Sequence, residues 1–369
     1  MKKILSAVTA AAIMLGLAGC AKEKSESTNE ASQRYFEAWM HVHHPEAEKT
    51  GLGIYILEDT EGTGEAEGIE GAEAGLDFTD ASYIYVTYTA RDLNGNVSST
   101  NDKKIAQQLG SYDKSYYYGP EIWSTSYMSL PAGVREMLKG MKTRGKRTAV
   151  IPAWLMDTKE YETEQEYLDN VTDKSSAIYT IEVADTTNDI YRKQIEKIEK
   201  LEYEYTDSLG RRQVWKVSAK DTIYTGFYYL KIQTGVEVEV EDEDAGSEMA
   251  LKALEDNSTV HINYTGSLLN GQVFDTTDEK TAKDNNIYSS SKTYSKVSAT
   301  WSSDSTAVQL NSNTVIQGFS STICRMKYYG AKGIGVFYSA LGYGTSGSGS
   351  IIPSYAPLIF EVNIEVEEE

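Results

Sequence analysis

The sequence predicts an α+β fold of two similar units, in each of which a curled antiparallel sheet packs on one short helix. A phrase occurs twice, "VTYTARDLNGNV" at residues 86–97 and "INYTGSLLNGQV" at residues 262–273. The same order of predicted elements also occurs twice along the chain. Apolar residues at positions i, i+4 and i+7 repeat as well, as Val134, Leu138 and Met141 and as Phe319, Ile323 and Met326. Two diverged copies explain these repeats better than one large domain does.

The first half contains the first copy of this element order. Its segments are a helix ending near Pro45, two strands, a short helix followed by a glycine turn and a strand, and a last strand, predicted at residues 31–47, 51–59, 83–89, 130–154 and 177–183. We place the boundary between the halves near residue 186.

The second half begins with a helical pattern at residues 187–204 and a strand at 225–235. Val260, Ile262 and Tyr264 share one face of the strand that carries the second phrase, because side chains alternate along a strand. The Asn-Gly turn joins it to a strand with Val273 and Phe274. Residues 276–305 are Ser/Thr-rich without a sustained period, which predicts a long surface loop inserted into the second unit.

The bulk composition narrows the function classes. The chain has 369 residues with 27 Tyr and 7 Phe, and Tyr favours strands. Its net charge of −20 argues against a protein that tracks nucleic-acid phosphates. A soluble acidic surface is the simpler interpretation.

The N-terminus is typical of a secretory signal. Lys2 and Lys3 precede an apolar run at residues 4–19 that is too short to span a membrane, and Cys20 follows directly. The "LAGC" ending resembles a bacterial lipoprotein cleavage box, with residues 1–19 as signal peptide and Cys20 as the lipidated first residue. The alternative is an ordinary signal cut nearby, with Cys20 incidental. Lipidation implies a cell-envelope protein anchored by lipid to the outer membrane, facing the periplasm or the surface, with residues 20–30 as a tether.

No cofactor or metal site is predicted. Cys324 is then the only other cysteine, so no intramolecular disulfide can form, and a packed small hydrophobe is its better interpretation. His41, His43 and His44 have no cysteine or carboxylate completing a ligand set nearby, which favours a solvated helix end.

Four stretches of the second half carry a resemblance to a known family. "VHINYTGSLLNGQVFDTT", "VIQGF", "GYGTSGSGSIIP" and "PLIFEVNIE" follow one another within residues 257–367. In content and order they resemble the signatures of the FKBP-type peptidyl-prolyl isomerases. The resemblance implies two FKBP-like units in tandem, with an isomerase domain at residues 186–369 that includes a leader helix and the inserted loop 276–305.

The resemblance carries over residue by residue to a site for a prolyl bond. The resemblance implies a pocket wall of Tyr264, Phe274, Asp275 and Phe360 and a pocket floor at Phe319. It implies that the second N–H of the pair Val315 and Ile316 donates to a substrate carbonyl and that the Tyr343 hydroxyl reaches the peptide. Ile351 and Ile352 are the implied loop isoleucines. Four positions depart from the family pattern. Phe319 replaces Trp, Ser348 stands where His is common, and aromatic residues are replaced at Thr306 and Val308.

The first copy keeps its core spacing but loses the site. Tyr88 remains, whereas Ser98 and Ser99 replace Phe-Asp and Leu130-Pro131 replaces Val-Ile. Proline has no N–H to donate. We interpret residues 31–185 as a degenerate FKBP-like domain used for structure, dimerisation or client binding.

The implied function is peptidyl-prolyl cis-trans isomerisation that assists the folding of exported proteins. Rotation about an X–Pro bond breaks no covalent bond, so it needs no acid, base, metal or nucleophile, but a dry aromatic pocket lowers the barrier. The expected partners are proline-containing unfolded or exported polypeptides and, through the lipid, a membrane. The alternative is a non-catalytic binding or chaperone module of the cell envelope, in which the aromatic pocket only grips its client.

Overall fold

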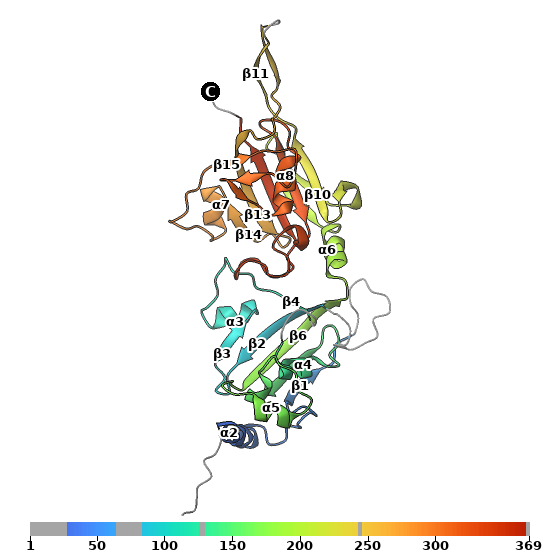
Figure 1. Cartoon of the computed structure of the whole chain (residues 1–369), viewed down its shortest axis with the longest axis vertical. Coiled ribbons are helices and arrows are strands. Elements are labelled where there is room, and N and C mark those ends of the chain that lie inside the picture. The colour runs from blue at the N-terminus through green and yellow to red at the C-terminus, as the bar shows by residue number, and fades with distance from the viewer. Residues whose placement is uncertain (1–27, 64–82, 125–129, 243–245, 367–369) are drawn as a thin grey trace, which may run out of the picture.

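The computed structural model of the chain contains two large antiparallel sheets, each with its own hydrophobic core (Figure 1). It describes residues 28–63, 83–124, 130–242 and 246–366. The signal, Cys20 and most of the tether of the sequence prediction lie outside these residues. Within the described ranges, none of the helices has the length and apolar character needed to span a bilayer.

The N-terminal unit comprises the elements up to the end of the first sheet. They are α2 (Thr28–His43), β1 (Tyr55–Thr60), β2 (Tyr83–Arg91), β3 (Val97–Thr100), α3 (Lys103–Gln108), β4 (Glu121–Ser124), α4 (Ala132–Leu138), β5 (Lys146–Ile151), the 3-10 turn η1 (Ala153–Leu155), α5 (Glu164–Asn170) and β6 (Ala177–Thr187).

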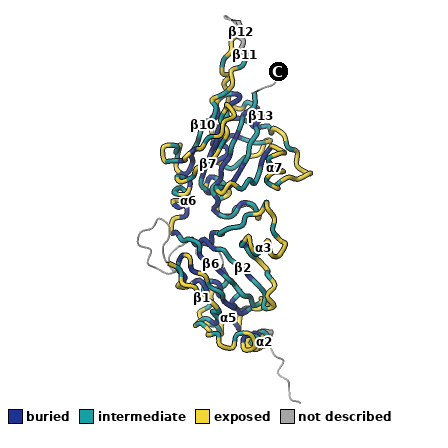
Figure 2. Tube along the Cα trace, turned by 180° about the vertical axis from the view of Figure 1, so that it is seen from behind, coloured by how far each residue is buried: buried dark blue, intermediate teal, exposed yellow. Residues whose placement is uncertain are grey.

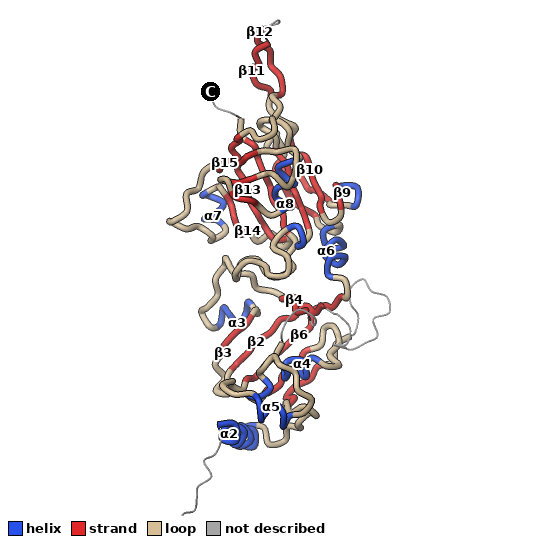
Figure 3. The backbone as a smooth tube through the Cα atoms, viewed as in Figure 1, coloured by secondary structure: helices blue, strands red, loops and turns tan. Residues whose placement is uncertain are grey.

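The C-terminal unit follows after two residues and contains two additional hairpins, β7–β8 and β11–β12, of which the second stands at the top of Figure 3. Its elements are α6 (Ile190–Ile198), β7 (Glu202–Thr206), β8 (Arg212–Lys216), η2 (Ala219–Asp221), β9 (Thr222–Tyr224), β10 (Phe227–Gln233), β11 (Glu237–Asp242), β12 (Gly246–Leu251), β13 (Thr259–Leu268), β14 (Val273–Thr276), α7 (Glu279–Asp284), β15 (Val297–Thr300), β16 (Gln309–Leu310), β17 (Asn313–Thr314), α8 (Gln317–Cys324), β18 (Lys332–Phe337), η3 (Ser339–Leu341) and β19 (Leu358–Ile364).

The two sheets share one strand order. The first runs β1-β5-β6-β2-β3 with β4 also paired to β2, and the second contains β10-β18-β19-β13-β14 with β15 also paired to β13. The registers correspond too, because Thr89 pairs with Thr100 in the first sheet as Thr265 pairs with Thr276 in the second. In both pairs the two threonine hydroxyl oxygens lie 2.9 Å apart. The α+β class with antiparallel sheets is confirmed.

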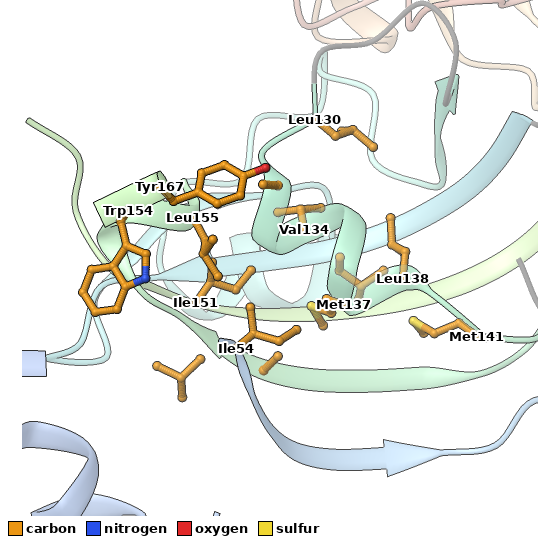
Figure 4. Close-up of a cluster of buried hydrophobic side chains, with 14 of the residues drawn as sticks. Ile54, Leu130, Val134, Met137, Leu138, Met141, Ile151, Trp154, Leu155 and Tyr167 are labelled. Carbon is orange, nitrogen blue, oxygen red and sulfur yellow. The ribbon is translucent and has the colours of Figure 1, made fainter. Parts of the chain in front are cut away.

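One short helix packs on each sheet, and its apolar residues enter the core. Figure 4 shows the N-terminal cluster, in which Val134, Met137 and Leu138 of α4 lie over Ile54 and Ile151. In the C-terminal unit the helix is α8, whose Phe319 and Ile323 are buried, as is Met326 just beyond its end. Buried residues line the strands of both sheets (Figure 2).

A glycine in each helix allows this close approach to the sheet. A Cβ atom at Gly318 would lie 2.3 Å from the Phe337 ring, and one at Gly133 would lie 2.2 Å from Cγ2 of Ile151. Heavy atoms cannot approach so closely without displacement of one of them. The two helices therefore meet their sheets at equivalent positions.

The segment 276–305 is not the irregular insertion that the sequence predicts. It contains α7, which Asp278 caps, and β15, which pairs with β13. The N-terminal unit has a counterpart in α3 and the following loop, since Tyr118 Oη accepts from the Asp113 N–H as Tyr294 Oη accepts from the Ser289 N–H. Both units thus contain this segment. Its polar composition reflects an exposed surface around a few buried side chains.

The helical pattern predicted over residues 187–204 is shorter in the structure. Helix α6 ends at Ile198, and residues from Glu202 belong to the hairpin β7–β8. Tyr203 and Tyr205 alternate with exposed neighbours along β7. This period of two is typical of a strand, and the helical pattern predicted from the apolar residues before it does not extend into it.

The two units pack against each other next to the β6–α6 connection. Tyr85, Ile122, Ile190 and Tyr355 form a small buried cluster drawn from both units. Lys193 of α6 pairs with Asp185 of β6 at 2.8 Å, with both side chains largely buried. Because a buried ion pair is costly to break, this contact restricts the relative motion of the units.

The close approach of α8 to the sheet makes a testable prediction. Gly318→Ala should lower the free energy of unfolding by about 1–3 kcal/mol, because the added methyl group overlaps the Phe337 ring. Urea unfolding followed by near-UV circular dichroism measures this change. Gly51→Ala is the matched control, since a Cβ there meets nothing within 4 Å. Equal unfolding midpoints for the two variants would contradict the packing described here.

Candidate active site

Aromatic rings from four elements converge on Phe360 of β19. Its ring centroid lies 4.7 Å from that of Phe319, 5.5 Å from Phe274, 5.9 Å from Phe337 and 6.1 Å from Tyr264. Phe360 and Phe319 are buried, while Phe274 and Tyr264 are partly exposed. The structure therefore brings the predicted wall, floor and Tyr residues into one cluster, with the unpredicted Phe337 beneath them.

Gly266 sets the spacing of these rings. In β13 it pairs with Phe360 on one side and with Asp275 on the other. A Cβ at this position would lie 2.7 Å from the Phe274 ring and 2.9 Å from the Phe360 ring. The two rings can meet edge to face only because this position has no side chain.

A hydrogen-bonded carboxylate lies at the edge of the cluster. Tyr264 Oη donates to Asp275 Oδ2 at 2.7 Å, and the Thr276 N–H donates to Oδ1 at 2.9 Å. Lys292 forms an ion pair with Asp275 and donates to the Thr276 carbonyl at 3.0 Å. Lys292 lies in the polar segment after α7, and sequence reasoning did not single it out because the spacing to Asp275 matches no local pattern.

The electrostatics of the site keep its two phenols protonated. Burial, and then the negative charge of Asp275, raise the pKa of Tyr264 well above its ordinary value. The same two causes, in the same order, raise the pKa of Tyr343, which is 38% exposed. Tyr343 can therefore present a neutral hydroxyl donor toward solvent near Asp275.

The start of α8 supplies a backbone donor. Val315 and Ile316 are half-buried and pack against the same core as the rings. Ile316 is the N-cap residue, with extended backbone angles (φ −59°, ψ 143°). Among the described residues its N–H has no hydrogen-bond acceptor, so it remains available to a carbonyl from outside.

The loop after η3 carries the remaining predicted residues. Gly344 and Gly347 adopt positive φ angles, and the backbone of Ser348 exchanges hydrogen bonds of 2.7 and 3.1 Å with Ile352. Ile352 is buried and Ile351 is half-buried, both beside the aromatic core. Ser348 thus stabilises the loop through hydrogen bonds of its backbone.

The other departures from the family pattern also have structural counterparts. Thr306 is exposed, whereas Val308 is buried in the core together with Trp301. The Trp301 Nε1–H donates to the Met326 carbonyl at 2.8 Å and so ties β15 to the end of α8. Sequence reasoning missed Trp301 because it read this segment as a loop, although a lone Trp in a polar stretch was a usable signal.

The N-terminal unit keeps the backbone of this site. Ala90 pairs with Ser99 as Gly266 pairs with Asp275. The Tyr88 and Ser99 side-chain oxygens are 3.0 Å apart, so a neutral hydroxyl stands in place of the carboxylate. Pro131 is the N-cap residue of α4, and its φ of −54° and ψ of 144° match those of Ile316. Unlike Ile316, it has no backbone N–H to donate.

The rings of that unit are largely replaced. The positions equivalent to Phe274, Phe319, Phe337 and Phe360 in strand register and helix spacing are Ser98, Val134, Ile151 and Tyr179. Tyr88 and Tyr179 stack at 6.4 Å, and the other three positions, Ser98, Val134 and Ile151, carry no ring.

No group of three or more His, Cys, Asp or Glu side chains in the described residues is placed to hold a metal ion. The polar groups gathered around the ring cluster are one carboxylate, one ammonium, two phenols and a backbone N–H.

The comparisons with known proteins place the C-terminal unit in a family. The model of the FKBP-type peptidyl-prolyl cis-trans isomerases matches residues 251–365. A comparison with curated proteins found no matching relative.

Similar solved structures share low sequence identity with this chain. A peptidyl-prolyl cis-trans isomerase from Pseudomonas syringae pv. tomato is 18% identical over 48% of this chain and 91% of its own, with a TM-score of 0.26. The three FKBP domains of wheat FKBP73 are 14% identical over 85% and 93%, and FkpA from Escherichia coli is 21% identical over 48% and 56%, each with a TM-score of 0.26.

Proposed function

Because the chain contains a domain of the FKBP-type peptidyl-prolyl cis-trans isomerase family, we propose that its C-terminal unit accelerates X–Pro rotation in exported proteins by desolvating the amide against the Phe360 ring cluster. The observation that carries the proposal is the arrangement of that cluster, in which aromatic rings from four elements surround Phe360 and a free backbone donor starts the adjacent helix. Isomerase chemistry follows from the family.

The barrier to be lowered comes from amide resonance and is about 18–20 kcal/mol. Water stiffens the amide by hydrogen bonding to the carbonyl oxygen, so transfer of the bond to an apolar surface weakens that resonance. The proline ring packs on Phe319 and Phe360, whose side chains are buried in the core. A rigid apolar surface can hold the ring in place while the preceding carbonyl rotates.

Two fixed donors favour the twisted form over the planar one. The Ile316 N–H is directed to a carbonyl of the bound peptide, and the Tyr343 hydroxyl to another. Asp275 acts through Tyr264, whose ring it orients by the 2.7 Å hydrogen bond. Preorganised donors of this kind lose no energy to reorganisation during the reaction.

The cell-envelope location rests on the N-terminal sequence. The basic residues, the apolar run and Cys20 are typical of a lipoprotein signal. A lipid-anchored isomerase meets proteins as they arrive in an unfolded state after export, when their prolyl bonds are heterogeneous. The N-terminal unit, which retains the fold without the ring cluster, serves in our proposal as a non-catalytic domain that contacts clients.

Substitutions in the C-terminal cluster should lower turnover of a proline-containing tetrapeptide. We expect Phe274→Ala to reduce kcat/KM about tenfold, since loss of ring contact of the order of 1.5 kcal/mol gives that factor. Tyr343→Phe should reduce it about fivefold through loss of one hydrogen bond of the order of 1 kcal/mol. Tyr205→Phe on the separate β7–β8 sheet is the control and should be neutral. A folded chain without activity above background would leave only the non-catalytic binding module.

The N-terminal unit should contribute no turnover. In the full-length chain, Phe274→Ala combined with Asp275→Ala should leave tetrapeptide isomerisation near background, because Pro131 offers no donor and Val134 no ring. Adding Ser98→Phe and Ser99→Asp to that variant should restore nothing. Turnover at the wild-type level in the first variant, with Pro131 and Ser98 unchanged, would contradict the assignment of all turnover to the C-terminal unit.

The anchor is tested by fractionation. Cys20→Ser removes the only thiol that lipid could modify at the predicted cleavage site, so the protein should move from the membrane fraction to the soluble one. Immunoblots of fractions after a high-salt wash measure the distribution. A variant that stays with the membranes as fully as the wild type refutes the lipid assignment.

A further inference from the structure

A cavity of about 370 Å³ lies where the N-terminal unit meets the loop that precedes β19. The N-terminal unit contributes residues from the end of β3, from the loop before β4 and from β4 itself. The C-terminal unit contributes four positions between Ser346 and Ile352, followed by Pro353 and Ser354. Figure 1 shows these two segments, one teal and one dark red, facing each other between the two sheets.

The N-terminal wall is aromatic and acidic. Tyr116, Tyr117, Tyr118 and Trp123 line it, and Glu121 is its only ionisable carboxylate. None of the lining residues is Lys or Arg. Aromatic faces attract cations, and a neighbouring carboxylate strengthens that attraction.

Glu121 is half-buried. Among the residues that the structure describes, no Lys, Arg or His forms an ion pair with it. Burial raises the pKa of Glu121, and a hydrogen bond with Trp123 offsets part of this rise. A carboxylate withdrawn from water is stabilised by an incoming positive charge, so the cavity is suited to a cationic group and unsuited to an anion.

The opposite wall is continuous with the candidate active site. The Tyr117 N–H donates to the Ser350 carbonyl at 2.8 Å, and Ser350 directly precedes Ile351 and Ile352. Gln272, two residues before Phe274, donates through its side chain to the Ser115 carbonyl at 2.9 Å. The loop of the N-terminal unit thus contacts the segment before Phe274 and the segment before Ile351, so the cavity lies beside the candidate active site.

We propose that this cavity is a subsite for a lysine or arginine side chain of the client polypeptide whose prolyl bond occupies the active site. The inference rests on the proposed function and extends it to client selection. The aromatic wall accommodates the methylene stem, Glu121 pairs with the charged head, and the neighbouring ring cluster holds the proline. The net charge of −20 on the whole chain favours the approach of basic segments.

Client selection can be measured with pairs of peptides. Each pair shares an Ala-Leu-Pro-Phe core and carries either Lys or the uncharged isostere norleucine at one position within four residues of the proline. Exchange between cis and trans forms, followed by NMR with the full-length protein, gives kcat/KM without a coupling protease. At the best position we expect Lys to be favoured about threefold to tenfold at low salt, which corresponds to cation–aromatic and ion-pair energies near 1 kcal/mol. The preference should shrink as salt screens the charge.

Two variants connect this preference to the cavity. Glu121→Gln should bring the Lys-to-norleucine ratio close to one and leave turnover of the norleucine peptide unchanged. Tyr116→Leu, at an exposed aromatic position, should lower the ratio as well and decides the matter if Glu121→Gln disturbs folding. Glu58→Gln, an exposed carboxylate on β1, is the matched control and should keep the wild-type ratio.

The outcomes separate this inference from the isomerase proposal. A wild-type ratio of one at every position, or a ratio that survives both Glu121→Gln and Tyr116→Leu, overturns the subsite. If no peptide is isomerised above background, the isomerase proposal fails and fluorescence anisotropy of the same labelled peptides still decides the subsite. Equal dissociation constants for Lys and norleucine peptides would then refute it, and tighter binding of Lys that Glu121→Gln abolishes would support it.

Discussion

The register of β13 with its two neighbours is the constraint on which the candidate site depends. Gly266 pairs with Phe360 in β19 and with Asp275 in β14, so one residue without a side chain fixes the separation of the rings on either side. A shift of one residue would turn Tyr264 to the opposite face and separate its hydroxyl from Asp275. The hydrogen bond between these two side chains, the ring cluster and the position of α8 below it all follow from that single alignment.

The N-terminal unit shows how much of this arrangement belongs to the backbone alone. It repeats the strand order, the paired threonine hydroxyls, the glycine in the helix and the backbone angles of the helix cap. The side chains at the site positions are different, with Ser98, Val134 and Ile151 where the other unit has phenylalanine rings. The two units therefore share a backbone arrangement but not the site residues, because main-chain pairing and core volume maintain the fold while a few side chains determine the site.

Local patterns in the sequence were sufficient for the class of fold and for much of the site. Alternation along β13 placed Tyr264, and helical spacing placed Phe319 and Ile323 in the core. Resemblance to a family supplied Ile316 and the loop isoleucines. Each of these inferences depends on neighbours in the chain or on a motif of adjacent residues.

Contacts between distant segments could not be predicted in the same way. Lys292 reaches Asp275 from a polar stretch whose composition suggested a loop, and α7 and β15 are stabilised by a few buried anchors within it. Phe337 lies under Phe360 through strand pairing that no local period encodes. The cavity between the units depends on how two sheets meet, which residues such as Tyr117 and Ser350 reveal only once the chain is folded.

The hydrogen bond from Tyr117 to Ser350 has a consequence for conformational entropy. The loop that contains Ser350 has glycines at positions 344, 347 and 349, and glycine-rich chains sample many backbone conformations when they are unconstrained. Anchoring this loop from the neighbouring unit restricts it before any peptide arrives. The entropy lost in ordering this loop is therefore lost when the chain folds, and not during a later binding event.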